Sequence, residues 1–238
     1  MAKERLDKLI ASTGRWSRRE VKTLVREGRV LVDGRIAGSA EEKYDPESCR
    51  IAVNGEELLL RRHTYVMLHK PAGVLSATED GRGRTVLDLL TPELRKIGVF
   101  PVGRLDKDTE GLLLLTDDGE LAHALLSPKK HVDKVYYARV SGRLTPEDCA
   151  AFEAGMTLGD GLECLPAGLE ILAAGETSEC LVTLREGKFH QVKRMLAARG
   201  KPVEYLKRLS MGSLRLDDTL APGEFRLLTA AEEAQLQR

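Results

Sequence analysis

Residues 103–119 read GRLDKDTEGLLLLTDDG. The leucines Leu112–Leu115 form a short apolar block, and the Asp-Asp-Gly that follows them is a turn signal. An apolar run of this length between polar segments is typical of a buried strand. Charged residues crowd the segment just before it, where burying a charge is costly unless the charge is paired or used. The stretch therefore predicts a core strand with a candidate site at its mouth.

The charged segment admits three interpretations on its residues alone. A polar loop that caps the strand is the simplest, because Asp and Thr are ordinary turn and cap residues. A calcium-binding loop is the second, because the acidic side chains of residues 106–110 fall near its ligand positions. Against it, Leu112 and Leu114 stand where such a loop needs polar ligands. The third is a catalytic carboxylate held by a neighbouring arginine.

Four motifs in chain order resemble those of the RNA pseudouridine synthases. They read KPAGV at 70–74, GRLD at 103–106 with T-x-G at 109–111, KVY at 134–136 and EGKFHQVKRM at 186–195. The likeness spans about 175 residues, the size of one ordinary domain. It implies the fold of that family, a mixed and largely antiparallel β-sheet with peripheral helices, and its activity, the isomerisation of uridine in RNA.

The resemblance also implies roles for individual residues. Isomerisation needs a group that can attack the ribose and leave again, and a carboxylate can do both. Asp106 is implied to be this nucleophile, and Lys193 to be the cation that keeps it ionised. Lys193 stands where many relatives are expected to carry arginine, so a point charge replaces a bidentate partner. Tyr136 is implied to lie against the uracil, and Arg104 to fill the gap left by the flipped uridine. The chemistry requires neither a metal nor a cofactor, so none is expected.

The first 60 residues predict a small module of two helices and a hairpin sheet. Ser17 and Glu20 form a capping box at the start of the second helix, and Gly28 ends it. The Asp-Gly at 33–34 and the Asn-Gly at 54–55 are tight-turn signals. The module resembles the RNA-binding domain first seen in ribosomal protein S-four through RLDK at 5–8, SRRE at 17–20, GRV at 28–30 and VDG at 32–34. This resemblance implies contact with structured ribosomal RNA.

Basic residues gather in two patches, although the formal net charge of the 238-residue chain is zero. One patch surrounds the second helix of the module and the other lies within residues 187–208. Local basic patches on a neutral chain predict contact with a polyanion. The expected RNA-binding residues are Arg5, Arg15, Arg18, Arg19, Lys22, Arg26, Arg29, Lys70, Lys188 and Arg194. Aromatic residues make up only 4% of the chain, so broad base-stacking platforms are not expected.

The rest of the chain predicts an α+β domain. Strands are expected at 65–69, 135–140 and 180–184, and helices near 85–91, 119–126, 146–154 and 190–199. Regular strand-helix alternation and a Gly-rich nucleotide loop are both missing from the sequence, which disfavours a doubly wound parallel sheet. We therefore expect an RNA-binding domain at 1–60 and a pseudouridine synthase catalytic domain at 61–238.

The expected activity is site-specific isomerisation of uridine in ribosomal RNA. Small-subunit RNA, free or in a pre-ribosomal particle, is the expected substrate because of the likeness at Ser127-Pro128, His190–Met195 and Ala221–Glu224. A large-subunit synthase and a non-catalytic ribosome-assembly factor are the alternatives.

The four cysteines are scattered, which disfavours zinc and a disulfide framework. Neither a membrane span nor a signal peptide is apparent, so a cytoplasmic protein is expected. A monomer is expected, since nothing demands a dimer. Histidines are expected to be structural, His190 among them, because the implied chemistry does not require one.

Overall fold

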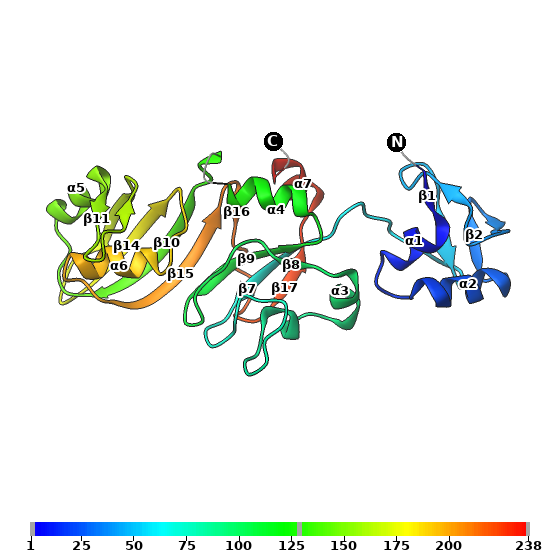
Figure 1. Ribbon diagram of the computed structural model, residues 1–238, viewed down its shortest axis with the longest axis horizontal. Coiled ribbons are helices and arrows are strands. Elements are labelled where there is room, and N and C mark those ends of the chain that lie inside the picture. The colour runs from blue at the N-terminus through cyan, green and yellow to red at the C-terminus, as the bar shows by residue number, and fades with distance from the viewer. Residues whose placement is uncertain (1–2, 128–129, 237–238) are drawn as a thin grey trace. The chain divides into compact units, whose positions relative to one another are not determined.

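The computed structural model describes residues 3–127 and 130–236, and Pro128 lies outside the described residues. The chain divides into two compact units, which Figure 1 traces from the N-terminal to the C-terminal end. The first unit contains the chain up to Thr64, together with residues 90–99 and 116–118. The second contains residues 65–89, 100–115 and the chain from Gly119 onward.

The first unit contains the predicted helices and hairpins. Its helices are α1 (Leu6–Ala11), α2 (Arg18–Arg26) and α3 (Pro92–Ile97). One sheet has the order β3-β2-β5-β6, formed by Arg35–Ile36, Val30–Val32, Ile51–Val53 and Glu56–Glu57. A second pairs β1 (Glu4–Arg5) with β4 (Lys43–Tyr44). The buried side chains of α1, α2, β2 and β5 share one apolar core.

Local sequence accounts for the boundaries of these elements. The capping box at the start of α2 is present, with Glu20 N donating to Ser17 Oγ at 3.3 Å and Ser17 N donating to Glu20 Oε2 at 2.6 Å. The turn residues Asp33, Gly34, Asn54 and Gly55 all have positive φ. Two successive positive φ values give a hairpin turn whose twist matches its strands. The predictions of a capped helix and two tight turns are therefore confirmed.

The second unit is built on a nine-stranded sheet whose main path is β13-β14-β10-β15-β9-β7-β17. These strands are Gly168–Ala173, Thr177–Leu184, Lys134–Ser141, Val203–Met211, Glu110–Thr116, Tyr65–Lys70 and Phe225–Leu227. β8 (Phe100–Pro101) pairs with β9, and β16 (Leu214–Arg215) pairs with β15. A small separate pair joins β11 (Met156–Thr157) to β12 (Glu163–Cys164). β10 is antiparallel to β14 and β15, whereas β15 is parallel to β9.

Helices lie around this sheet (Figure 1). They are the 3-10 helix η1 (Val86–Leu89), α4 (Gly119–Leu126), α5 (Pro146–Ala154), α6 (Gln191–Ala198) and α7 (Ala230–Leu236). α5 packs against β13 and α6 against β15. The mixed, largely antiparallel sheet with peripheral helices agrees with the predicted α+β class.

Strand β9 carries the predicted leucine block, and Leu112–Leu115 are fully buried. The parallel contact with β15 extends over two residue pairs, Lys207 with Glu110 and Arg208 with Gly111. A Cβ atom on Gly111 would lie 2.2 Å from the carbonyl oxygen of Arg208, and the φ of Gly111 is +105°. Only glycine permits this close approach of the two backbones.

The structure also corrects several expectations. The calcium-loop interpretation fails because Glu110–Thr116 is a strand, so no helix-loop-helix forms there. The predicted helix near 85–91 is the short 3-10 helix η1. Strand β15 is absent from the predicted strands, because its charged residues Glu204, Lys207 and Arg208 obscure the apolar alternation.

All four cysteines are free, and Cys164 and Cys180 are buried. Within the described part of the chain, no helix combines the length and apolar character that crossing a bilayer requires.

Candidate active site

The loop from Arg104 to Thr109, which precedes β9, carries the candidate nucleophile and is held by the end of β7. Lys70, the last residue of β7, is fully buried beneath this loop. Its ammonium group donates to four backbone carbonyls, those of Pro71 (3.0 Å), Asp106 (3.1 Å), Lys107 (3.3 Å) and Thr109 (2.9 Å). These bonds tie the turn around Asp106 to the sheet.

The expectation that Lys70 binds RNA is therefore wrong. A side chain with no exposed surface and four carbonyl partners cannot contact a phosphate while the loop keeps this conformation. Burial lowers the pKa of Lys70 to about 8, against the opposing attraction of Asp108 and Asp106. Lys70, the first residue of the KPAGV motif, therefore has a structural role.

Two further contacts join the segment after Lys70 to the same loop. Gly73 N donates to the carbonyl of Lys107 at 2.7 Å. The Ser76 hydroxyl donates to the carbonyl of Leu105 at 3.0 Å and accepts from Leu105 N at 3.1 Å. The backbone on both sides of Asp106 is thereby held by hydrogen bonds from residues 70–76.

Asp106 lies beside a cation on α6. The ammonium group of Lys193 is 3.1 Å from Asp106 Oδ2 and 2.5 Å from Asp108 Oδ1. The side chains of Asp106 and Lys193 are 25% and 23% exposed, whereas that of Asp108 is 76% exposed. The predicted pairing of Asp106 with Lys193 is present in the geometry. Asp108 is a second partner of Lys193, and the sequence did not predict this contact.

The protonation of this cluster follows from its contacts. The hydrogen bond from Lys193 is the main cause that lowers the pKa of Asp108. Burial favours a lower pKa for Lys193, but the hydrogen bonds to Asp108 and Asp106 outweigh burial and raise it. Lys193 therefore stays an ammonium ion at neutral pH, as a counter-ion to the carboxylates must.

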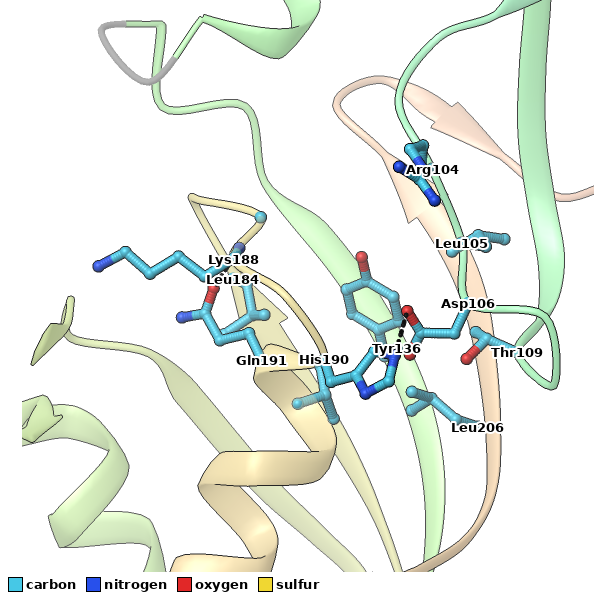
Figure 2. Close-up of a pocket in the computed structure, with 12 residues that line it drawn as sticks. Arg104, Leu105, Asp106, Thr109, Tyr136, Leu184, Lys188, His190, Gln191 and Leu206 are labelled. Atoms are coloured by element: carbon cyan, nitrogen blue, oxygen red, sulfur yellow. Dashed lines mark hydrogen bonds and ion pairs between the residues drawn. The ribbon is translucent and has the colours of Figure 1, made fainter. Parts of the chain in front are cut away.

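His190 approaches Asp106 from the start of α6. Its Nε2 atom is 3.5 Å from Asp106 Oδ1, the contact dashed in Figure 2. The residue adopts a left-handed backbone with φ of +51° and occupies the N-cap position of α6. The His190 ring therefore lies at the site, and its expected structural role stays a prediction.

A pocket of about 420 Å³, including its open mouth, lies at these residues (Figure 2). Asp106, Tyr136, His190 and the apolar side chains of Leu184 and Leu206 line it. Tyr136 is nearly buried, and Arg104 is exposed at the pocket. The four predicted catalytic residues, Arg104, Asp106, Tyr136 and Lys193, thus come together at one place, although Lys193 reaches Asp106 from outside the lining.

Thr109 supplies another polar group to the pocket. Its side chain is 1% exposed, and its hydroxyl has no hydrogen-bond partner among the described residues. A buried hydroxyl without a partner is costly. Thr109 belongs to the predicted motif, but the sequence carries no signal that its hydroxyl is unpaired.

The expected RNA-binding residues differ in how far they are already neutralised. Arg5 and Arg18 pair with the buried Asp7, and Lys22 pairs with Glu41. Arg15 and Arg29 pair with Glu56 and Glu27. Lys188 pairs with Glu186, and Arg194 lies 2.5 Å from Asp160. Of the expected RNA-binding residues of the module, Arg19 and Arg26 have no carboxylate partner among the residues that the structure describes.

The described residues contain no group of three or more His, Cys, Asp or Glu side chains placed to hold a metal ion. The charges around Asp106 instead come from Lys193 and Asp108, with His190 alongside. The arrangement offers a carboxylate beside a cation, at the edge of a pocket with both apolar and polar walls. Such a site can perform nucleophilic chemistry on a planar polar substrate.

Comparison with known proteins relates the whole chain to two described families. The family described as RNA pseudouridylate synthase matches residues 64–198, and the S4 domain matches residues 4–48. An uncharacterized RNA pseudouridine synthase of Bacillus subtilis is 51% identical over 96% of each chain. The ribosomal small subunit pseudouridine synthase A of Vibrio cholerae is 40% identical, covering 98% of this chain and 99% of the relative.

A relative named for the other ribosomal subunit is nearly as similar. The ribosomal large subunit pseudouridine synthase B of Bacillus subtilis is 39% identical over 98% of this chain and 96% of its own length. The crystal structure of a pseudouridylate synthase has 35% sequence identity and a TM-score of 0.68, covering 98% of this chain and 99% of that one.

Proposed function

Because this chain belongs to the RNA pseudouridylate synthase family, we propose that it isomerises a specific uridine of small-subunit ribosomal RNA, with Asp106 as the nucleophile. The observation that supports the role of Asp106 is its position. Its carboxylate lines the pocket, lies 3.1 Å from the Lys193 ammonium and is carried by a loop that Lys70 holds in place.

The proposed reaction begins when an oxygen of Asp106 attacks C1′ of the ribose. The bond from C1′ to N1 breaks, and its electron pair leaves with the uracil. The uracil turns within the pocket, C5 bonds to C1′, and the carboxylate departs with the electrons of its own bond to carbon. Loss of the C5 proton to solvent and gain of a proton at N1 then complete pseudouridine, which has the same composition as uridine.

The other residues serve these steps. Lys193 places its ammonium group 3.1 Å from the Asp106 carboxylate as its counter-ion. Tyr136 forms part of the wall against which the uracil lies, and its hydroxyl is the group we assign to removal of the C5 proton. Arg104, exposed at the pocket, enters the space in the RNA that the flipped uridine vacates.

The choice of RNA rests on the relatives. Both a small-subunit and a large-subunit enzyme resemble this chain at almost equal identity. The motif likeness at His190–Met195 and Ala221–Glu224 favours the small subunit. We further propose that the protein acts as a monomer in the cytoplasm, with residues 1–60 docking the RNA and residues 61–238 performing the reaction.

The test is release of tritium from ribosomal RNA whose uridines carry the label at C5. Small-subunit and large-subunit RNA are compared as substrates, each free and within precursor particles. The natural protein is expected to release tritium from small-subunit RNA, and Asp106→Asn is expected to release none. Asp108→Asn is the matched variant, since it removes a neighbouring carboxylate that contacts the same lysine.

Asp108→Asn is expected to retain activity within about tenfold, because a charge near the site is removed without loss of the nucleophile. Release from large-subunit RNA alone would reassign the substrate and leave the chemistry intact. Equal loss in both variants would contradict the specific role of Asp106. Tight RNA binding without release from any RNA would favour the assembly-factor alternative.

A further inference from the structure

Phe189 presents a flat apolar surface directly beside the site. Its side chain is 75% exposed, the largest exposed fraction among the large hydrophobic residues that the structure describes as exposed. The others in that group, such as Leu59 and Leu172, are aliphatic. An exposed Phe stands out in a chain with only 4% aromatic residues.

The Phe189 ring is ordered by a stack on His190. The two ring centroids are 3.8 Å apart and their planes differ by 19°. The His190 ring in turn approaches Asp106, with Nε2 3.5 Å from Oδ1 (Figure 2). One face of the Phe189 ring is therefore covered by a residue of the pocket, while most of the side chain remains open to solvent.

The backbone holds this arrangement at a cost. His190 has a left-handed φ of +51°, a conformation that costs a non-glycine residue on the order of 1 kcal/mol. Exposure of an aromatic ring adds a further cost, since apolar surface is favoured when buried. His190 is thus a strained residue beside the proposed nucleophile Asp106, and its ring stacks on the exposed ring of Phe189. Local conflicts of this kind are expected where a protein makes a functional contact.

The chemistry of the surroundings selects the partner. An apolar protein partner would need a broad apolar patch, whereas Phe189 is a single exposed ring whose sequence neighbours are Lys188 and His190. A single exposed flat ring suits a nucleobase, because stacking on an aromatic side chain is indifferent to the identity of the base. Once a uridine is flipped out of its strand, its neighbour also loses a stacking partner.

We propose that Phe189, backed by His190, is a stacking platform for the base of the nucleotide adjacent to the target uridine. This inference rests on the proposed function, since it places one more nucleotide of the same RNA beside the same pocket. The platform compensates the neighbouring base for the stacking that it loses when the uridine enters the pocket.

The first test compares side chains of similar size at position 189. Phe189→Leu keeps an apolar side chain but removes the ring, and it is expected to lower kcat/KM for tritium release roughly ten- to hundredfold. Phe189→Trp restores a ring and is expected to stay within about threefold of the natural protein. Unchanged kcat/KM in Phe189→Leu would overturn the proposal, as would an equal loss in both variants.

A fluorescence measurement tests the same contact without catalysis. Trp16 is the single tryptophan of the chain, so Trp16→Phe combined with Phe189→Trp gives one reporter at the platform. Binding of a short oligouridylate is expected to quench this reporter through stacking. The matched control places the reporter at Leu172, a half-exposed residue of the edge strand β13, where no quenching is expected.

The two arms separate this proposal from the proposed function. If the natural protein releases no tritium from either ribosomal RNA, the proposed function fails. The fluorescence measurement at position 189 still tests whether Phe189 is a stacking platform. Absence of quenching at position 189 while the oligonucleotide binds, or equal quenching at positions 189 and 172, would overturn the platform.

Discussion

The ammonium group of Lys193 lies 3.1 Å from a carboxylate oxygen of Asp106. Lys193 belongs to α6, whereas Asp106 belongs to the loop before β9, so the pair joins two segments that are far apart in the chain. The same ammonium group also contacts Asp108 at 2.5 Å. One cation thus serves two carboxylates, which makes its removal more damaging than loss of a surface ion pair.

Replacement of Lys193 by methionine is expected to lower kcat/KM for tritium release by about a hundredfold, since Asp106 loses the cation that stabilises its charge. Lys193→Arg keeps the charge and is expected to retain most of the activity. Lys96→Met, which removes an exposed lysine of α3, serves as the control. Equal rates for Lys193→Met and the control would contradict the counter-ion role.

Lys70 makes a pH-dependent contribution to stability. Burial lowers its pKa from 10.5 to about 8 in the folded protein. Between these values the unfolded chain keeps a proton that the folded protein has released, so the free energy of unfolding rises with pH. The rise is complete near pH 10.5 and amounts to about 3 kcal/mol at most.

Urea unfolding of the natural protein and of Lys70→Met at about pH 7.5 and about pH 10 measures this effect. Other titrating groups are common to both proteins, so they cancel in the difference between their free energies of unfolding. The natural protein is expected to gain stability relative to the variant as the pH rises. A difference that does not change with pH would show that Lys70 has the same pKa in both states.

Gly111→Ala is expected to destabilise the protein by more than about 3 kcal/mol, or to prevent folding. The added methyl group would meet the carbonyl of Arg208 at 2.2 Å, between β9 and β15. Gly73→Ala is the matched control, because Gly73 also has a positive φ but open space around its Cβ position.

The Gly73→Ala control measures the cost of backbone strain alone, which is about 1–2 kcal/mol. Urea unfolding of both variants separates the two effects. Similar losses in Gly111→Ala and Gly73→Ala would mean that the collision with Arg208 is relieved by a small shift of the strands.

Arg19 and Arg26 of the N-terminal unit have no carboxylate partner among the described residues, so they are expected to be available for contact with RNA phosphates. The double variant Arg19→Ala/Arg26→Ala is expected to reduce the salt dependence of RNA binding, with the slope of log K against log salt falling by about one for each phosphate that the variant no longer neutralises. Arg29→Ala is the comparison, since Arg29 already pairs with Glu27. Filter binding over a series of salt concentrations measures the slopes, and an unchanged slope in the double variant would exclude both arginines from phosphate binding.

Much of the local structure could be predicted because its causes are local. The leucine block of β9, the capping box of α2 and the two glycine turns depend on residues within a few positions of one another. Motif order also led to Asp106, Tyr136 and Lys193, which the fold brings to one pocket or its edge.

Other features could not be read from the chain because they depend on partners distant in sequence. The position of Lys70 in a strand leaves open whether its ammonium faces a phosphate or backbone carbonyls, and only packing of the loop at 104–109 decides this. β15 escaped prediction for a similar reason, since its buried Arg208 donates to the carbonyl of Leu112 on β9.

The family, the α+β class, several of the main strands and the residues proposed for chemistry could be predicted from the sequence. They follow from short-range patterns and motif spacing. The tertiary structure alone decided that Lys70 is buried, that Asp108 shares Lys193 with Asp106, and that Phe189 is stacked on a pocket residue. The physical reason is that burial, ion pairing and ring stacking are properties of surfaces in contact, and chain folding brings those surfaces together from distant positions.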